Sequence, residues 1–184
     1  MPSRWPHEET ARGARQWPIL ERLIQRVEAS PTLDGMVLLG SFARGVVDAL
    51  SDLDLVLVVP DGGFEAAWAA RAELRGGSML AAWDQRDPGF PRAGAHKWIT
   101  GDLVLVECLL ATPSSGVRLA EPAAVLAGGR ELLDRFPRRP PVTRAEMAAH
   151  PLDVHPIERA YDQLKEDVRR TLSPGLGDRG PRGR

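Results

Sequence analysis

Two acidic residues flank a leucine at the start of an apolar run. Asp52 and Asp54 lie two positions apart, and only apolar residues follow from Leu55 to Val59. Side chains two positions apart on a β-strand point to the same face, so these carboxylates would repel each other without a cation between them. Magnesium is a hard cation that prefers carboxylate oxygens. The pair therefore indicates a divalent-metal site at the beginning of a strand.

A third acidic residue lies inside a second apolar run, Leu103–Leu110. Glu107 stands in the middle of this run, where an ionisable group is costly unless it is paired or coordinated. Leu105 and Leu109 would share its strand face, which disfavours a solvent-facing position. Glu107 is therefore the candidate third ligand, and three carboxylates could complete a site for two metal ions.

Other acids could compete with Glu107 for this role. Asp102 lies in a predicted turn and Asp84 follows a predicted strand. Turn chemistry explains Asp102 more simply, and a loop position explains Asp84. Asp48 lies before the acidic pair and is interpreted as a loop-capping residue.

A glycine-serine turn precedes the acidic pair. Gly40-Ser41 follows a predicted strand and opens a predicted short helix. Glycine lets the backbone approach a ligand closely, and the first N–H groups of a helix favour phosphate oxygens. Arg44 lies about one helical turn further on, where its guanidinium could bind the same anion through two donors. A phosphate-binding turn is therefore predicted next to the metal site.

Some residues near these motifs allow two interpretations. Lys97 could contact a triphosphate, or it could be a solvated strand end. Cys108 alternates with Glu107 and should face away from the site as a small buried side chain. Trp68, Trp83 and Trp98 could stack on a base, but aromatic core residues are commoner.

The elements that must position these residues alternate between helix and strand. Strands are predicted over Met36–Leu39, Leu53–Val59, Met79–Trp83, Lys97–Thr100 and Leu103–Leu110. The last two form a hairpin about Gly101-Asp102, and Asp84–Ala95 is predicted as a loop. Helices are predicted over Ile19–Ala29, Phe64–Leu74, Val117–Leu126, Arg130–Phe136 and Pro156–Leu172. This order predicts an α+β (mixed α/β) fold with a mixed sheet, flanking helices and a helical C-terminal extension.

The chain is expected to have four parts. Residues 1–18 are predicted as a flexible N-terminal segment and 19–112 as the core. Residues 113–172 are predicted as a helical C-terminal part and 173–184 as a disordered tail, since the tail is rich in glycine, proline and arginine.

The composition excludes several classes of protein. A net charge of −1 over 184 residues argues against nucleic acid or an anionic membrane as the general partner. The single cysteine excludes an internal disulfide framework. The apolar runs are too short to span a bilayer, and the N-terminus lacks the apolar region of a secretory signal. The expected location is therefore the cytoplasm.

The segment from Gly40 to Asp54 resembles the signature of the DNA polymerase β-like nucleotidyltransferase superfamily. The signature reads Gly-Ser, two residues, Arg-Gly, five residues and Ser-Asp-x-Asp. Here Gly40-Ser41, Arg44-Gly45 and Ser51-Asp52-Leu53-Asp54 match it throughout, spacing included. The hairpin that ends in Glu107 is similar to the strand that carries the third carboxylate of the family. The resemblance to the core fold covers residues 19–111.

This resemblance implies a catalytic mechanism and assigns residues to it. Asp52, Asp54 and Glu107 would hold two Mg²⁺ ions, with Mn²⁺ as the alternative, and Glu107 could also take the proton of the acceptor hydroxyl. The residues implied in nucleotide binding are Gly40, Ser41, Arg44 and Ser51. An acceptor hydroxyl would attack the α-phosphorus of an NTP, so that a nucleoside monophosphate is transferred and pyrophosphate leaves.

The acceptor is expected to be a small hydroxylated molecule. Relatives of this size and build resemble the antibiotic nucleotidyltransferases, whose acceptor lies between the sheet domain and a helical segment, here Arg144–Leu172. Small members of the superfamily in toxin–antitoxin pairs modify a protein or tRNA instead, and this alternative stays open. A nucleotide-binding module without turnover is a further alternative. The oligomeric state is not predicted.

Overall fold

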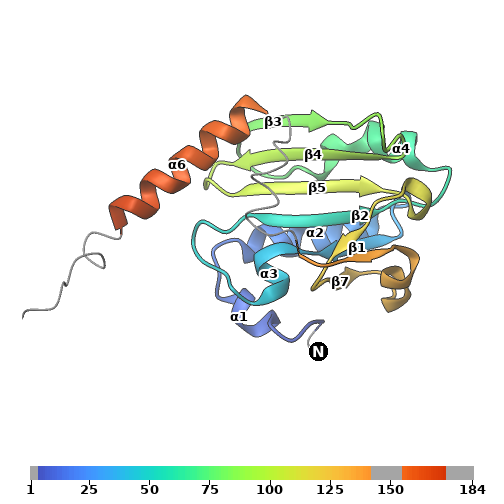
Figure 1. Cartoon of the computed structure of the whole chain (residues 1–184), viewed down its shortest axis with the longest axis horizontal. Coiled ribbons are helices and arrows are strands. Elements are labelled where there is room, and N and C mark those ends of the chain that lie inside the picture. Colours follow the sequence, from blue (N-terminus) through green and yellow to red (C-terminus); the bar gives the residue numbers. More distant parts are fainter. Residues whose placement is uncertain (1–3, 142–154, 173–184) are drawn as a thin grey trace, which may run out of the picture. The chain divides into compact units, whose positions relative to one another are not determined.

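A mixed sheet of six strands carries the candidate site residues (Figure 1). In spatial order its strands are β3 (Met79–Gln85), β4 (Ala93–Thr100), β5 (Leu105–Ala111), β2 (Leu53–Val58), β1 (Gly35–Leu38) and β7 (Ala124–Ala127). The neighbours β2 and β5 run parallel, and the other neighbouring pairs are antiparallel. The predicted α+β class with a mixed sheet is confirmed, and so is the predicted hairpin, which β4 and β5 form.

The computed structural model describes residues 4–141 and 155–172. The chain divides into two compact units, Met1–Val142 and Thr143–Arg184. The sheet belongs to the first unit, and the second contains the helix α6 (Pro156–Leu172), as the sequence predicts. The predicted tail over 173–184 and the first part of the predicted acceptor-binding segment, 144–154, lie outside the described residues.

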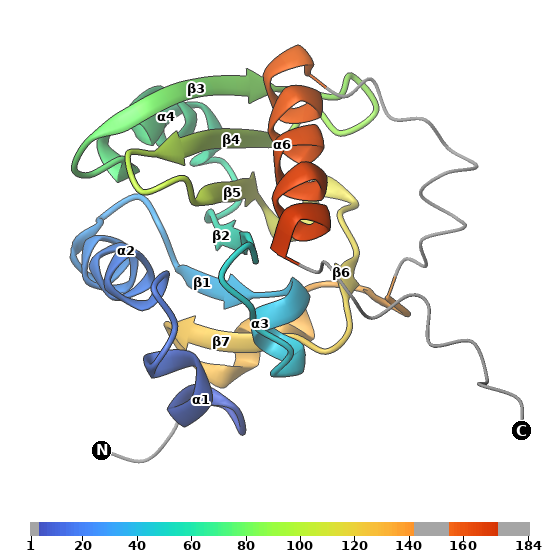
Figure 2. The same cartoon turned by 90° about the vertical axis from the view of Figure 1, so that its left-hand side faces the viewer.

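Helices and short elements connect the strands of the first unit. They are α1 (Glu8–Arg12), α2 (Trp17–Ala29), α3 (Gly40–Arg44), α4 (Phe64–Ala70) and the 3₁₀ helices η1 (Arg71–Leu74), η2 (Pro113–Ser115) and η3 (Arg130–Arg135). Two short strands, β6 (Leu119–Ala120) and β8 (Arg138–Arg139), form a separate parallel pair. Figure 2 shows α2 and α4 on the same side of the sheet, where their buried side chains form the main core with those of the inner strands.

The helix α2 follows directly from its sequence. Pro18 lies in its first turn, where the missing N–H of proline costs no hydrogen bond. One face of the helix is buried and consists of Ile19, Leu20, Leu23, Ile24 and Val27. Ser30 has an extended conformation and ends the helix before Pro31, because a residue that precedes proline avoids the helical region.

The strand β2 is buried on both faces. Leu53, Leu55 and Leu57 are at most 2% exposed and belong to the main core, as the sequence predicts. Val56 and Val58 point to the opposite face and belong to a second apolar cluster. A strand covered on both faces consists of a nearly continuous run of apolar residues. Asp54 is charged and departs from this pattern near the start of β2.

The N-terminal residues differ from the predicted flexible segment. Between residues 4 and 18 the chain contains α1, and Trp5 and Ala11 are buried in the main core. The carboxylate of Glu8 forms an ion pair with Arg12 at 2.9 Å. Burial of an aromatic ring removes enough apolar surface from water to hold a short polar segment in place.

The predicted helix over Val117–Leu126 is wrong. This stretch contains β6 and β7, and β7 pairs with the outer edge of β1. Pro122 lies inside the predicted helix, where it can donate no backbone hydrogen bond and clashes with the preceding turn. The stretch therefore extends the sheet instead of forming a helix.

Two further boundaries differ from the predictions. The predicted loop over Asp84–Ala95 is shorter, because β3 continues to Gln85 and β4 begins at Ala93. Pairing between these strands, with Asp84 opposite His96, overrides the weak strand propensity of the individual residues. The predicted helix over Arg130–Phe136 is the 3₁₀ helix η3.

Candidate functional site

The strand register places Asp54 beside Glu107. These residues are partners on the parallel strands β2 and β5, and Lys97 of β4 is the next partner of Glu107. Partner positions on neighbouring strands lie about 4.8 Å apart and point to the same face. The three side chains therefore form one row across the sheet, on the face opposite to the main core, and Trp83 of β3 continues the row.

Lys97 forms an ion pair inside this row. Its Nζ lies 3.3 Å from Oε2 of Glu107, and the side chain of Glu107 is 30% exposed. Lys97 itself is only 8% exposed, so the alternative of a solvated strand end is wrong. A buried ammonium group needs a charge partner to offset its lost hydration, and Glu107 supplies it.

The turn after β1 contacts the acidic strand directly. Gly40 has a positive φ of 66°, and a Cβ at this position would lie 1.7 Å from Oδ2 of Asp54. The backbone N–H of Leu39 donates to the carbonyl of Asp54 at 2.9 Å. Only glycine can therefore occupy position 40, since both its backbone conformation and the nearby carboxylate exclude a side chain.

The rest of the glycine-serine motif forms a short turn of helix. Ser41 is half-buried in α3, and Arg44 in its last turn is exposed. Gly45 closes α3 with a φ of 73°, and a Cβ there would lie 2.5 Å from the ring of His7. The second glycine of the motif is thus required by the chain conformation and by packing against the N-terminal segment.

The loop that leads to Asp52 is held by hydrogen bonds. Ser51 Oγ donates to Oδ1 of Asp48 at 3.0 Å and accepts from the Asp48 N–H at 2.9 Å. Asp48 also caps the loop through the Leu50 N–H at 2.8 Å, in agreement with the sequence interpretation. The hydroxyl of Ser51 therefore contacts the loop itself, and Asp52 follows as the last residue before β2.

Gln16 positions this loop and is a residue that the sequence analysis missed. Its Nε2 donates to the carbonyls of Asp48 at 3.0 Å and Ser51 at 2.8 Å, and the residue is fully buried. The local pattern gives no signal, because a glutamine before an amphipathic helix is usually solvated. Gln16 connects the start of α2 to the segment that carries the first acid.

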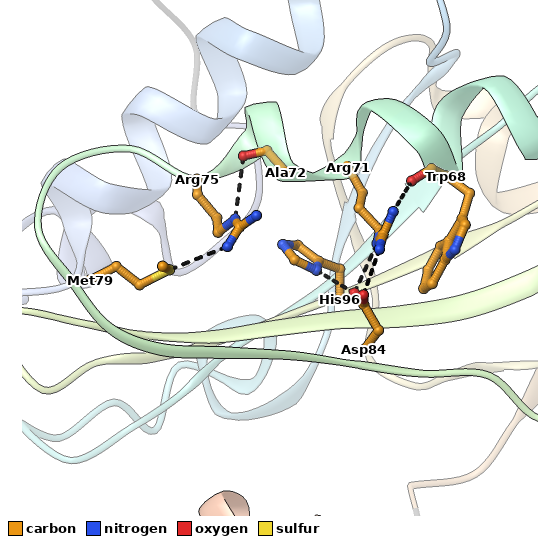
Figure 3. Close-up of polar contacts among 7 residues, drawn as sticks. All are labelled: Trp68, Arg71, Ala72, Arg75, Met79, Asp84 and His96. Atoms are coloured by element: carbon orange, nitrogen blue, oxygen red, sulfur yellow. Dashed lines mark hydrogen bonds and ion pairs between the residues drawn. The ribbon is translucent and has the colours of Figure 1, made fainter.

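A second polar cluster lies on the opposite face of the sheet (Figure 3). Arg71 donates to both carboxylate oxygens of Asp84, at 2.9 and 2.6 Å, and His96 Nδ1 lies 2.7 Å from Oδ1 of Asp84. The hydrogen bond from Arg71 is the main reason why the pKa of Asp84 is lowered to about 2, and burial lowers the pKa of His96. Since His96 precedes Lys97 on β4, this cluster faces away from Glu107.

The positions of the competing residues follow from this arrangement. Asp84 is paired on the far face, and Asp102 is exposed in the turn between β4 and β5. Cys108 is fully buried on the far face in the main core, where burial raises the pKa of its thiol. Trp68 and Trp98 also belong to the packing of that core, whereas Trp83 lies in the row with Lys97.

The acids fit a divalent cation by the chemistry of their donors and by strand position. Asp54 and Glu107 are register partners, Asp52 lies two positions before Asp54, and carboxylates are preferred magnesium ligands. Over residues 4–141 and 155–172, no three His, Cys, Asp or Glu side chains are grouped closely enough to hold a metal ion. In this conformation the carboxylate of Glu107 is paired with Lys97.

The family model of a nucleotidyltransferase domain matches residues 19–118, which is more than half of the chain. The chain belongs to this family. The match begins in α2 and ends after η2, so it includes the Gly40 turn, Asp54 and Glu107. The resemblance found in the sequence is confirmed, and the nucleotidyltransferase is an enzyme that transfers a nucleoside monophosphate from an NTP. No curated protein matches the nucleotidyltransferase significantly.

A helix that spans a bilayer is long and apolar. Within residues 4–141 and 155–172, no helix of the nucleotidyltransferase combines the length and the apolar character that crossing a membrane requires.

Proposed function

We propose that this nucleotidyltransferase is magnesium-dependent and transfers a nucleoside monophosphate to the hydroxyl of a small acceptor molecule, with release of pyrophosphate. The proposal depends mainly on one observation: Asp54 and Glu107 are register partners beside the Gly40 turn. A carboxylate pair next to a tight backbone turn offers metal ligands, and backbone N–H groups that can donate hydrogen bonds to phosphate, within one site.

The three acids would hold the metal. Asp52 and Asp54 come from the start of β2, and Glu107 comes from the parallel neighbour β5. When bound, Mg²⁺ would offset the negative charge of the triphosphate and make the acceptor hydroxyl more acidic. Glu107 would also accept the hydroxyl proton, and Lys97 Nζ lies 3.3 Å from that carboxylate.

The Gly40 turn would bind the triphosphate. Glycine at position 40 lets the turn pack directly against the Asp54 carboxylate, so a triphosphate bound at the turn would lie next to the acids, and the Ser41 hydroxyl follows directly. Arg44 is exposed in the last turn of α3 and could bind the terminal phosphates through its guanidinium. Ser51 would contribute to nucleotide binding through the loop that it holds with Asp48.

The bond changes balance without a further reactant. The acceptor oxygen forms a bond to the α-phosphorus, and the bond from that phosphorus to the pyrophosphate oxygen breaks. The proton of the hydroxyl passes to Glu107, and pyrophosphate leaves with the negative charge. Most of the rate enhancement would come from positioning and from electrostatic stabilisation of the developing charge.

The net charge of the chain indicates which class of acceptor it uses. The net charge of −1 suits a small molecule better than a polynucleotide, whose binding needs many cationic contacts. Antibiotics with free hydroxyl groups are acceptors of this kind. We also propose a cytoplasmic location, where the NTP substrate is made.

The test measures transfer and pyrophosphate release together. The full-length protein is incubated with MgCl₂, each α-labelled NTP in turn and a pool of hydroxylated antibiotics and sugars. We expect a labelled acceptor and an equal amount of pyrophosphate. Label that appears only on an added protein or tRNA would replace the small-molecule acceptor, and nucleotide binding without any release would contradict the proposal.

Variants of the acids locate the site. Asp54→Asn and Glu107→Gln should each reduce kcat by about a thousandfold, because each removes a charge from the reacting centre. Asp102→Asn is the matched control, since Asp102 is exposed in a turn, and it should keep wild-type activity. Circular dichroism should show the same fold in all three variants. Full activity of the Glu107→Gln variant would mean that Glu107 has no part in the reaction.

A further inference from the structure

A groove runs along the outer edge of β7. It has a volume of about 1390 Å³, which exceeds the range of about 300–1,000 Å³ that is typical of small-molecule sites. Its wall along the sheet is the continuous segment Pro122–Gly128, and the opposite side includes Arg4, His7 and Arg44. The groove therefore has room for a ligand larger than a typical small molecule, along the segment Pro122–Gly128.

The edge of β7 can recognise a main chain. Among the described residues, β7 is the last strand of the sheet, and β1 is its one strand partner. A strand at an edge presents backbone N–H and C=O groups toward its outer side. Leu126 and Ala127 are only 3% exposed, so the accessible part of this edge is the segment from Pro122 to Val125. An extended peptide can add to such an edge as another strand, with affinity from the main-chain hydrogen bonds.

The groove concentrates positive charge. Arg4, Arg44 and Arg130 line it, and Glu28 is the acid among its lining residues. Glu28 lies 3.7 Å from Arg4, so their charges offset each other. Arg44 and Arg130 are exposed and form no ion pair with the residues that the structure describes. This local excess stands out in a chain whose net charge is −1, and it favours an acidic ligand.

We propose that this groove binds an acidic, extended segment of a partner protein, which adds to β7 as a further strand. A second copy of this chain is a poor occupant, because two β7 edges would bring the same arginines together. Single-stranded nucleic acid is also disfavoured, since it binds by stacking on aromatic rings, and the tryptophan of the groove, Trp5, is only 4% exposed.

The partner site goes beyond nucleotide transfer and does not depend on it. Arg44 nevertheless belongs to both sites, because it ends α3 and lines the groove. A bound acidic segment would therefore share this guanidinium with a triphosphate, and the two ligands would weaken each other. Binding of one ligand must then reduce the affinity for the other by the same factor.

The experiment uses a fluorescein-labelled hexapeptide of alternating glutamate and valine as the probe. We expect the full-length protein to bind it, with fluorescence anisotropy as the readout, and not to bind the matching lysine-valine peptide. Arg130→Glu should weaken binding at least about tenfold, because it removes a charge-assisted hydrogen bond and adds repulsion toward the acidic probe. Arg92→Glu is the matched control, because Arg92 is exposed and lies outside the groove, and it should bind as the wild type does.

Backbone recognition is tested on the probe. Two versions of the hexapeptide are N-methylated at alternate residues, so that each blocks one edge of the strand. One version should lose binding, and hydrogen exchange should slow within residues 123–125 when the unmethylated probe is bound.

Several results would overturn the proposal. They are equal binding of both methylated versions, an unchanged affinity of the Arg130→Glu variant, and displacement of the probe by oligo-dT. Dimerisation of the free protein that protects residues 123–125 would assign the groove to a second copy instead.

Discussion

The two faces of the sheet each pair an acid with a base, but in different ways. On the far face Asp84 accepts from Arg71 through both oxygens and contacts His96. On the site face Glu107 pairs with Lys97 through one oxygen and lies beside Asp54. The Asp84 carboxylate contacts hydrogen-bonding groups at both oxygens. The Glu107 carboxylate instead lies beside another carboxylate, that of Asp54. The acid on the far face is therefore neutralised by its own neighbours, whereas the acids on the site face are the ones proposed to bind a cation.

Among the variants that compare the two faces, the largest effect is expected from Gly40, which contacts Asp54 on the site face. Gly40→Ala would force alanine into the left-handed region at a cost of about 1–2 kcal/mol, and its Cβ would displace the Asp54 carboxylate, which lies 1.7 Å from that position. Activity in the pyrophosphate assay should fall about a hundredfold, because the reacting groups lose their alignment.

A control variant at Gly62 separates backbone strain from displacement of the Asp54 carboxylate. Gly62 also has a positive φ, of 88°, and a Cβ there would meet nothing within 4 Å. Gly62→Ala should lower the free energy of unfolding by a similar strain but leave kcat unchanged. Equal losses of activity in both variants would show that backbone strain, rather than contact with Asp54, explains the glycine at position 40.

An intermediate effect is expected from removing a base on each face. Lys97→Met leaves the Glu107 carboxylate without the ammonium 3.3 Å away and should destabilise the metal-free protein by about 1–2 kcal/mol. Added Mg²⁺ should restore much of this loss, because a divalent cation can replace the missing positive charge. Thermal unfolding with and without Mg²⁺ measures both quantities.

Arg71 on the far face is the residue to compare with Lys97. Arg71→Met removes the donor to both oxygens of Asp84, and we expect a loss of stability that Mg²⁺ does not restore. Lys97→Arg should behave as the wild type does. If Mg²⁺ raises the unfolding temperature of the Lys97 and Arg71 variants equally, the two faces do not differ in cation binding.

The smallest expected effect is the pH dependence that His96 contributes. Burial lowers its pKa from 6.5, so below pH 6.5 the unfolded chain binds a proton that the folded protein does not. The free energy of unfolding should therefore fall as the pH decreases from 6.5 toward the pKa of His96 in the folded protein. Above pH 6.5 the full stabilisation from neutral His96 should be present. Asp84, with a pKa of about 2, stays ionised throughout this range.

Denaturant unfolding at a series of pH values measures this slope. His96→Phe should flatten the curve between pH 5 and 7, since the other three histidines of the chain remain in place. An unchanged slope in this variant would assign the pH dependence to another group.

The sequence predicts the parts of the site that depend on local spacing. Gly40, Arg44 and Asp54 lie within one short segment, and the structure places Gly40 against Asp54. The leucines of β2 and the hairpin of β4 and β5 also follow from local patterns. Strand periodicity alone was enough to place Glu107 and Cys108 on opposite faces.

Other features depend on contacts between distant segments. The burial of Lys97 follows from the register of three strands, which no local pattern reports. β7 is a short strand that pairs with β1 across a large sequence separation, and its alanines do not favour a strand. Gln16 holds a loop that lies more than 30 positions away, so its role is visible only in the folded chain.

The parallel pairing of β2 with β5 has a consequence for the order of assembly. The chain leaves β2, builds β3 and β4, and only then returns to lie against β2. During synthesis a nascent chain that ends at β4 already contains the Gly40 turn, Asp52 and Asp54, but it lacks Glu107 of β5. Such non-local pairings form late in folding, so the row of Asp54 and Glu107 should form in one step, when β5 docks against β2.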